Sequence, residues 1–445
     1  MVLIGERLLI HAPTPVKRIL LVMPTAWDAK QLAGCPVLGE RFELVWSEPA
    51  DAECPAGLDP GAFVAEAAAG RWGEIHGVAT SSDYPGALLA GAIAARLALP
   101  GPSPGAVLRC SHKWYARLAQ RECVPEATPA FDLLAPHGRG VPAIGFPCFV
   151  KPVKSAYSIL ARRITSEAEL AAYRASPRLA EFFDAYLRIF HRIVRETSDL
   201  ELDGRWLIAE EVVEGQPVTV EGWAAGGEVD LLGLVDSTCD PATGSFLRFD
   251  YPSGLDARVQ ERMGAIARRA IRHLGLDGSL FNLEMFYDAA RDRISILEIN
   301  PRMCGQFADL YAKVDGTNGY EVALALAAGE RPAPARGRGA FAAAASFPLR
   351  VFQPVRVVRA PDARDVRAAE ARFPGTLVWN ECASGDLLTD FEFGEDGRSQ
   401  RYAVVNLGGA DRADCAARLA ELRSLLGHAF EPLAARPAAP AGSRA

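Results

Sequence analysis

The chain has 445 residues, of which 49% are hydrophobic and 23% are charged. This composition is typical of a globular protein with more than one domain. The net charge of −7 argues against a nucleic-acid binder, which usually has a basic surface. No apolar run has membrane-spanning length and no signal peptide is recognisable, so we expect a cytoplasmic protein. The nine cysteines lack a CxxC pair, which favours reduced thiols.

Strand and helix patterns alternate over the first 110 residues. The expected elements are strands at 18–23, 41–46 and 76–82, and helices at 60–69 and 85–97. Such alternation predicts a parallel sheet covered by helices. We therefore expect an N-terminal α/β domain over residues 1–110.

The central part of the chain, residues 111–335, combines helices with longer strands. One helix is expected over 110–123, and Gly226 and Gly227 predict a β-hairpin turn. The segments "LFNLEMFYD" and "RISILEI" read as adjacent strands, because only a short polar turn separates them.

A Pro- and Gly-rich stretch at 329–339 predicts a linker. Short strand patterns and one helix near 412–426 follow it, so we expect a small α+β domain over 336–432. The residues 433–445 have low complexity and are expected to be disordered.

Two carboxylates and an amide form the first candidate site. Glu284 lies in one of the adjacent strands, and Glu298 and Asn300 lie in the other. Residues two apart in a strand share a face, so these oxygens can converge. Carboxylate and amide oxygens suit Mg²⁺ that also bridges phosphate oxygens. The alternative is that both glutamates are exposed and pair with nearby arginines.

Two lysines form the second candidate site. Lys113 lies within the helix expected over 110–123, in "SHKWYAR", and Lys151 ends the apolar strand "FPCFV". A lysine that ends a buried strand is seldom a solvated surface charge, and an ammonium group is suited to binding phosphate. The segment "AEEVVEG" adds a strand edge whose backbone groups could meet a planar base.

These motifs, in this order, resemble those of the ATP-grasp superfamily. Lys113, "FVKPV", "AEEVVEG" and "NLEMFYD…ILEINPR" carry the resemblance, which covers most of the chain. In motif order, the resemblance is to the carboxylate–amine ligases, such as D-alanine–D-alanine ligase and carnosine-type dipeptide ligases, and to biotin carboxylase. The implied fold is α/β: an N-terminal parallel-sheet domain, an ATP-grasp domain and a small C-terminal α+β cap.

The resemblance also implies roles for individual residues. Lys113 and Lys151 are implied to contact the α- and β-phosphates of ATP. Arg302 is implied to steady the transferred phosphoryl group or the substrate carboxylate. The implied hinge strand, whose backbone meets adenine, comprises Glu210, Glu211 and Val213, and the implied ligands of Mg²⁺ (or Mn²⁺) are Glu284, Glu298 and Asn300.

The sequence departs from the family pattern at two places. The flap after Lys151 contains no glycine, so Lys154, Ser155 and Ser158 are expected to contact phosphate through side chains. An acid that binds the ribose in many relatives is replaced by Pro217. Glu214 or Glu221 could take over that contact.

Three further residues are candidates for contact with the substrate. Arg248 lies in a segment where relatives place substrate-facing loops, and it could equally pair with Asp250. Gln306 and Asp309 follow "NPR" and could line the acceptor site or cap the next helix.

The predicted function is ATP-dependent joining of a carboxylate, of an amino acid or a related small acid, to an amine through an acylphosphate, with release of ADP and phosphate. Such chemistry needs positioned charges and no protein nucleophile. A non-catalytic ATP sensor and a bicarbonate-activating enzyme are the alternatives. The expected partners are small molecules, without nucleic acid or membrane, and a homodimer is compatible with this prediction.

Overall fold

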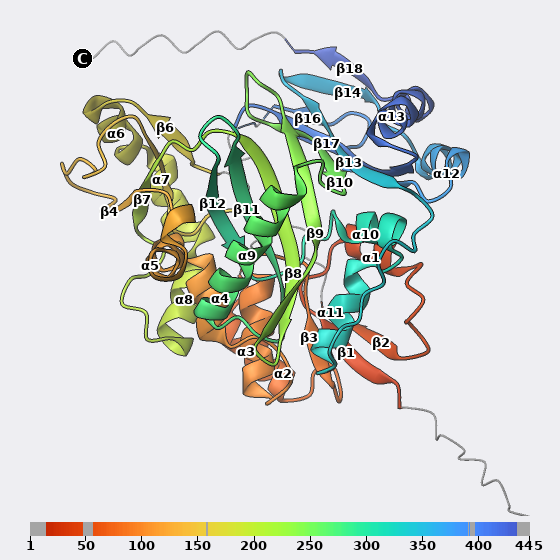
Figure 1. Cartoon of the computed structure of the whole chain (residues 1–445), viewed down its shortest axis with the longest axis horizontal. Coiled ribbons are helices and arrows are strands. Elements are labelled where there is room, and N and C mark those ends of the chain that lie inside the picture. The colour runs from red at the N-terminus through yellow and green to blue at the C-terminus, as the bar shows by residue number, and fades with distance from the viewer. Residues whose placement is uncertain (1–14, 48–56, 157–158, 390, 392–396, 434–445) are drawn as a thin grey trace, which may run out of the picture.

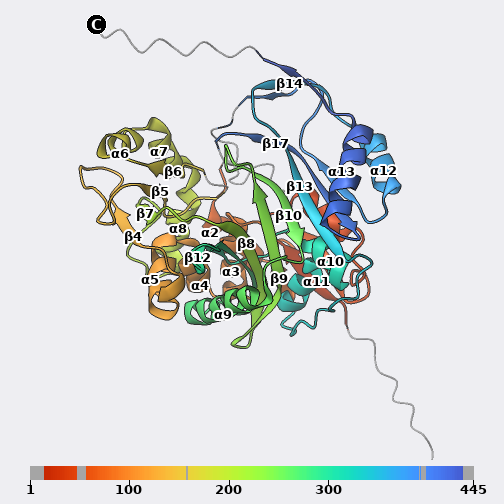
Figure 2. The same ribbon diagram turned by 45° about the horizontal axis from the view of Figure 1, so that its top comes forward.

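The computed structural model describes residues 15–47, 57–156, 159–389, 391 and 397–433. Three units pack together in the ribbon views of Figure 1 and Figure 2. Residues from all three line a central cavity. Within the described ranges, no helix is both long and apolar enough to cross a membrane. The predicted tail lies almost wholly outside these ranges.

The N-terminal unit is a three-stranded parallel sheet in the order β2-β1-β3, as predicted. Its strands are short and apolar, and Ile19 and Leu20 of the central strand are fully buried. The elements are β1 (Lys17–Leu21), α1 (Ala26–Leu32), β2 (Phe42–Trp46), α2 (Pro60–Ala68), β3 (Gly77–Ala79) and α3 (Gly86–Arg96).

The helix predicted over 110–123 is wrong in its start, because two helices meet there. Helix α4 (Pro104–Ser111) ends at His112, and α5 (Lys113–Cys123) begins immediately afterwards. His112 is the break, since its backbone is extended, with φ −93° and ψ 102°. This break places Lys113 at the first position of a helix, where its backbone N–H donates to the Val153 carbonyl at 2.7 Å.

A four-stranded antiparallel sheet and its helices form a second unit, called here the small lobe. Its strand order is β4-β7-β5-β6, which places β5 and β7 at the centre. The elements are β4 (Phe131–Leu134), β5 (Cys148–Pro152), β6 (Arg162–Ile164), α6 (Glu167–Arg174), α7 (Pro177–Glu181), a π-helical turn (Phe182–Tyr186), α8 (Arg188–Thr197) and β7 (Leu207–Glu211).

The third unit is built on a large sheet of eight strands. The order is β12-β11-β8-β9-β10-β13-β17-β15, and every pairing in it is antiparallel. The strands are β8 (Gln216–Ala225), β9 (Glu228–Cys239), β10 (Phe246–Tyr251), β11 (Ser279–Asp288), β12 (Arg293–Asn300), β13 (Ala343–Val351), β15 (Leu377–Asn380) and β17 (Gln400–Gly409).

Local sequence explains the connections within this sheet. The predicted hairpin between β8 and β9 is confirmed, and both Gly226 and Gly227 have positive φ, which a type I′ turn requires. Helix α9 (Ala257–Leu274) crosses one face of the sheet in Figure 1. It ends at Gly275, which adopts the left-handed conformation favoured at helix C-termini. Helices α10 (Ala308–Asp315) and α11 (Gly319–Ala327) follow β12.

The C-terminal segment continues the large sheet. Strand β13 follows the Pro- and Gly-rich stretch and pairs with β10. The sequence predicted one helix here, and the structure adds α12 (Ala363–Arg372) to α13 (Arg412–Leu426). A three-stranded sheet, β16-β14-β18, completes the cap with β14 (Val355–Arg359), β16 (Leu387–Leu388) and β18 (Ala429–Pro432). The division into independently folding domains stays a prediction.

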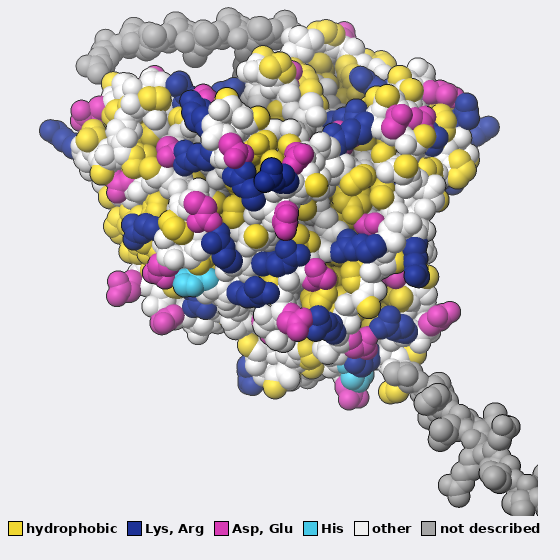
Figure 3. All heavy atoms as spheres, in the orientation of Figure 1, with side chains coloured by type: hydrophobic (Ala, Val, Ile, Leu, Met, Phe, Trp, Pro, Cys, Tyr) yellow, Lys and Arg dark blue, Asp and Glu magenta, His cyan; other side chains and the backbone are white. Residues whose placement is uncertain are grey.

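Helix α1 joins the N-terminal unit to the third unit at two places. The Trp27 ring stacks on Trp379 of β15, with 5.4 Å between centroids. The Trp27 indole also donates to the Gly305 carbonyl at 3.0 Å. Basic and acidic side chains are interspersed on the face that Figure 3 shows, without the broad basic surface of a nucleic-acid binder.

Gly77 allows β3 to pack against α11, and this contact predicts a stability effect. A Cβ at Gly77 would overlap the carbonyl oxygen of Ala327. We expect Gly77→Ala to lower the free energy of unfolding by about 1–3 kcal/mol, the usual cost of overpacking. Chemical denaturation measures this loss. Gly34→Ala is the control, since a Cβ there meets nothing within 4 Å, and equal effects of the two variants would contradict the packing argument.

Candidate functional site

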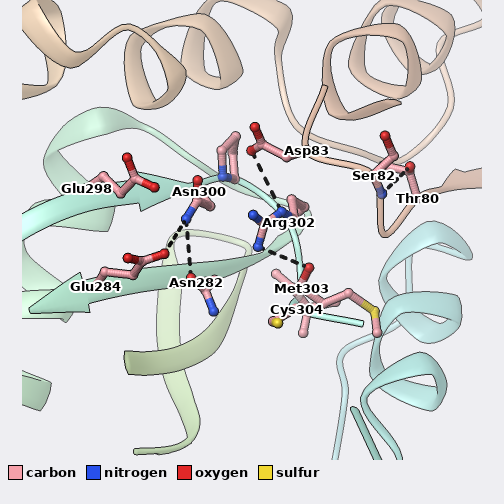
Figure 4. Close-up of polar contacts among 12 residues, drawn as sticks. Thr80, Ser82, Asp83, Asn282, Glu284, Glu298, Asn300, Arg302, Met303 and Cys304 are labelled. Atoms are coloured by element: carbon pink, nitrogen blue, oxygen red, sulfur yellow. Dashed lines mark hydrogen bonds and ion pairs between the residues drawn. The ribbon is translucent and has the colours of Figure 1, made fainter. Parts of the chain in front are cut away.

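Two carboxylates face each other across β11 and β12. Glu284 is the cross-strand partner of Glu298, and Asn282 is the partner of Asn300. Figure 4 shows all four side chains on one face of the strand pair. The Asn300 amide donates to Asn282 Oδ1 at 3.3 Å and to Glu284 Oε1 at 3.4 Å. The predicted convergence of Glu284, Glu298 and Asn300 is therefore present.

The two carboxyl groups differ in charge state because their surroundings differ. Burial and the neighbouring negative charge of Glu298 raise the pKa of Glu284 to about 8. Burial opposes ionisation of Glu298 as well, but the charges of Lys113 and Lys151 hold its pKa below the usual range. Two negative charges so close together are unfavourable in a buried site unless cations offset them. The pair therefore has the electrostatics of a cation site.

Both predicted lysines reach the same region. Lys113 Nζ lies 3.1 Å from Glu298 Oε2 and donates to the Ser155 carbonyl at 3.0 Å. Lys151 Nζ lies 2.8 Å from Glu210 Oε2. Burial lowers the pKa of Lys151, while the charge of Glu210 opposes that change. Lys113 thus contacts the carboxylate pair directly, and the buried Glu210 holds Lys151.

Glu210 has a structural role that its sequence position did not suggest. Its second carboxylate oxygen accepts from Arg117 Nε at 2.7 Å, so one acid pairs with two buried cations. Although burial opposes ionisation, Arg117 and Lys151 lower the pKa of Glu210 to about 2. Arg117 also donates to the Leu297 carbonyl at 2.7 Å, which fixes β12 next to α5.

The hinge segment lies at the end of β7. Glu210 and Glu211 belong to the strand itself, where they pair with β4 and β5. Val213 and Glu214 follow in the connection to β8. The Glu211 side chain pairs with Arg293 at 2.5 Å. Contact of this backbone with adenine stays a prediction.

Two of the predicted flap residues, Lys154 and Ser155, are buried in the structure. Lys154 is only 2% exposed, and its ammonium pairs with Asp83 Oδ2 at 2.7 Å. Ser155 is buried beside Lys113. Ser158 lies outside the described residues. A contact of these side chains with phosphate stays a prediction.

Neither candidate for the ribose contact lines the central cavity. Glu221 is buried, and its carboxylate accepts from Tyr311 at 2.7 Å and from the Cys304 N–H at 2.6 Å. It therefore holds the loop between β12 and α10, residues 301–307. Glu214 is exposed and pairs with Arg291 at 3.4 Å. Pro217, in contrast, lines the cavity.

The three candidate substrate residues are placed differently. Gln306 lines the cavity, and its amide donates to Ser346 Oγ at 2.8 Å. Arg248 pairs with Asp250 at 2.6 Å, which favours the structural alternative for that residue. Asp309 is buried in contact with Lys313 and Asn406, away from the cavity.

The central cavity has a volume of about 200 Å³ and extends from the carboxylate pair over the face of the large sheet. Phe246, Phe249 and Phe307 supply apolar surface between its ends. Arg350 and Arg401, from β13 and β17, line the far end. The cavity thus has carboxylates and Arg302 at one end, aromatic surface in the middle and two arginines at the other end, where Arg401 also pairs with Glu381 at 2.6 Å.

Sequence reasoning missed Asp83 and Asn282, which both line the cavity. Asn282 could have been found, because it lies two residues before Glu284 and so shares its face. Asp83 follows the carboxyl end of β3, the edge at which parallel α/β sheets place ligand-binding residues. That rule, applied to the predicted strand at 76–82, was the available signal.

The donor set fits a divalent cation only together with ligand oxygens. Within the described ranges, no group of three or more His, Cys, Asp or Glu side chains is arranged to hold a metal ion. Glu284, Glu298 and Asn300 supply two carboxylates and one amide, all hard oxygen donors. Mg²⁺ commonly binds through one or two carboxylates plus substrate phosphates, so these residues fit that mode.

No protein-family model matches the chain, and no curated protein sequence matches it. Solved structures do resemble it over nearly its whole length. An L-amino acid ligase from Bacillus licheniformis is 15% identical, with a TM-score of 0.68 over 94% of this chain and 99% of that one. A biotin carboxylase–ATP-analogue complex from Campylobacter jejuni is 14% identical, with a TM-score of 0.62 over 94% and 92%.

A third structure is the N5-carboxyaminoimidazole synthase from Aspergillus clavatus, in complex with ADP and 5-aminoimidazole ribonucleotide. It is 12% identical, with a TM-score of 0.62 over 92% of this chain and 99% of that one. These proteins have the ATP-grasp fold, and the chain therefore has the ATP-grasp fold, with a parallel N-terminal sheet and a large antiparallel sheet, as the motifs predicted.

The buried Glu210 cluster predicts a pH-dependent stability effect. Glu210→Gln leaves Arg117 and Lys151 buried without a counter-charge, so we expect a loss of about 3–5 kcal/mol at pH 7. The folded-state pKa of Glu210 is depressed to about 2. Its stabilising contribution is therefore present above the unfolded-state pKa of about 4.5 and is lost as the pH falls toward about 2.

Denaturation curves across this pH range provide the measurement. The difference between wild type and Glu210→Gln should shrink as the pH falls below about 4.5. Glu211→Gln is the matched neighbour, because its pair with Arg293 is partly exposed and is worth about 0–1 kcal/mol. A Glu210→Gln variant as stable as Glu211→Gln would contradict the role of Glu210 as the counter-charge of Arg117 and Lys151.

Proposed function

We propose that the protein is an ATP-dependent ligase that joins a small carboxylic acid to an amine and forms ADP and phosphate. The observation that carries this proposal is the acidic pair Glu284–Glu298 with Lys113 and Lys151 beside it, at the end of a cavity in an ATP-grasp fold. The similar solved structures include an L-amino acid ligase and complexes with ATP, ADP and MgADP, which support it.

Each group has a part in the proposed reaction. Lys113 and Lys151 bind the nucleotide phosphates, and Glu284, Glu298 and Asn300 hold Mg²⁺ (or Mn²⁺). The metal, when bound, offsets charge on the transferring phosphoryl group. Arg302, whose side chain lies beside this end of the cavity, steadies the acid or the phosphoryl group. The acid carboxylate attacks the γ-phosphorus, ADP leaves, and the amine then displaces phosphate from the acylphosphate.

The cavity beyond the metal site supports two small substrates. Its apolar middle and basic end provide surface for an acid and an amine above the sheet.

A sensor that binds ATP without transfer would have less need of the lysines, arginine and carboxylates together. A bicarbonate-activating enzyme is the second alternative, because one similar structure is a biotin carboxylase. Bicarbonate-dependent ADP formation would favour that alternative. Assembly as a homodimer stays a prediction.

The Glu298 carboxylate should be essential for turnover. We expect Glu298→Gln to lower ATP turnover by about 100-fold or more while the fold is retained, because the cation whose charge would stabilise the transition state loses a ligand. ADP release, measured over a panel of acids and amines, tests this. Asp292→Asn, in the exposed turn between the same two strands, is the control and should turn over normally. Undiminished turnover by folded Glu298→Gln would refute the site assignment.

The nucleotide products distinguish the proposed chemistry from adenylation. We expect ADP and phosphate, because Glu284, Glu298, Asn300 and Arg302 gather at one strand end, where a bound metal and the arginine would act on the terminal phosphate. Hydroxylamine in place of the amine should intercept the acylphosphate and give a hydroxamate. Phosphorus NMR of the products, with an iron assay for hydroxamate, makes the measurement. Stoichiometric AMP would overturn the acylphosphate route.

A further inference from the structure

The small lobe is joined to the N-terminal unit through helix α8. This helix contacts α2 and α3, and Figure 1 and Figure 2 both show it beside the helices of the N-terminal unit. Its inner face is apolar, with Ile189, Phe190 and Ile193 buried in the core that the two units share. At the rim of this contact, Arg192 pairs with Asp59, the N-cap of α2. The small lobe is therefore packed firmly on the N-terminal unit.

Tyr84 makes the most specific contact across this boundary. It lies in the loop after β3 and is only 2% exposed. Its hydroxyl accepts a hydrogen bond from the Phe190 N–H at 3.1 Å and donates one to the Tyr186 carbonyl at 2.7 Å. In a regular α-helix these two backbone groups would bond to each other, because they are four residues apart. The hydroxyl of one unit thus lies within the hydrogen-bond ladder of a helix of another.

The π-helical turn before α8 is the local feature that admits this hydroxyl. There the Leu187 N–H donates to the Phe182 carbonyl, five residues earlier, at 3.1 Å. Such a wider turn interrupts the regular ladder, and a side chain can insert at the interruption. A buried N–H and carbonyl that lose their partner are costly. The geometry of this helix and the position of Tyr84 therefore depend on each other.

The residue before Tyr84 contacts the small lobe at a second place. Asp83 pairs with Lys154 at 2.7 Å, and the Lys154 ammonium also lies 5.6 Å from the centre of the Tyr84 ring. Lys154 comes three residues after Lys151, just beyond the end of β5. The loop after β3 therefore holds the small lobe both at α8 and beside the strand that carries Lys151.

We propose that Tyr84 is a positioning residue of the nucleotide site: its hydroxyl fixes the small lobe, and with it Lys151, relative to Glu284 and Glu298. This proposal rests on the proposed function, which assigns the nucleotide phosphates to Lys151. The contacts of the loop after β3 with the small lobe join protein groups only, so they need no bound nucleotide. The site is thus preorganised before the nucleotide binds, which lowers the cost of binding.

Tyr84→Phe tests this role because it removes a single oxygen atom. Stopped-flow fluorescence with the N-methylanthraniloyl derivative of ADP and Mg²⁺ measures nucleotide affinity and release. We expect the affinity of the folded variant to fall about three- to tenfold, mainly through faster release, as loss of one buried hydrogen bond permits. Tyr402→Phe is the matched control, because it removes the hydroxyl of a buried tyrosine in the C-terminal cap, and it should change neither quantity.

A second background shows whether Tyr84 acts through Lys151. In Lys151→Met the ammonium that the small lobe presents to the phosphates is gone. Adding Tyr84→Phe to this variant should then change the affinity by less than about twofold, because the effects of coupled residues are not additive. A purely structural role of the hydroxyl would give the same loss in both backgrounds.

Hydrogen exchange of the wild-type protein covers the case in which Tyr84→Phe does not fold. The backbone amides of residues 182–197 should exchange equally slowly with and without Mg²⁺ and ADP, because the contact with Tyr84 forms without nucleotide. Exchange slowed about tenfold or more by the nucleotide would overturn the proposal, since the nucleotide would then fix the lobe. Where Tyr84→Phe folds, the same amides should exchange faster than in wild type.

The outcomes separate this proposal from the ligase proposal. Unchanged affinity and release in folded Tyr84→Phe, or an equal loss in the Lys151→Met background, would overturn the role of Tyr84. ADP formation over the panel of acids and amines would then leave the ligase function standing. Faster nucleotide release in Tyr84→Phe, without ADP from any acid, would instead refute the ligase function alone. Failure of the wild-type protein to bind the nucleotide would overturn both.

Discussion

Glu284 and Glu298 lie directly opposite each other on neighbouring antiparallel strands. Like charges placed this way are destabilising, so the surrounding structure must offset them. Lys113 contacts Glu298, and the pKa of Glu284 is raised to about 8, which keeps that carboxyl group largely protonated at neutral pH. The protein therefore tolerates an unfavourable acidic pair at one end of the cavity, and a bound cation would relieve it.

The charged groups around this pair come from all three units of the fold. Helix α5 supplies Lys113, and strand β5 of the small lobe supplies Lys151, which Glu210 holds in place. The N-terminal unit supplies Asp83, and the loop after β12 supplies Arg302. Contacts such as the Trp27–Trp379 stack fix these units relative to one another. The site consequently depends on how the units are packed together, and no single unit contains it.

The sequence predicted the parts of the site that follow from local periodicity. Glu298 and Asn300 share a strand face because the side-chain period is two, and a short turn makes β11 the neighbour of β12. The roles of Asp83 and Glu221 could not be predicted in this way, since their partners lie far away in the chain. Burial of Lys154 is a similar case, because it depends on contact with another unit. The break at His112 was also missed, since neither Gly nor Pro marks it.

The central claim is that Glu284 and Glu298 together bind a divalent cation beside the nucleotide. Mn²⁺ titration followed by electron paramagnetic resonance, with a non-hydrolysable ATP analogue present, tests it most directly. The account predicts one tightly bound Mn²⁺ in wild type, whose resonance signal shows hyperfine coupling to the phosphorus nuclei of the ATP analogue. The signal of bound Mn²⁺ should be lost in both Glu284→Gln and Glu298→Gln. An unchanged bound-Mn²⁺ signal in the two folded variants would contradict it.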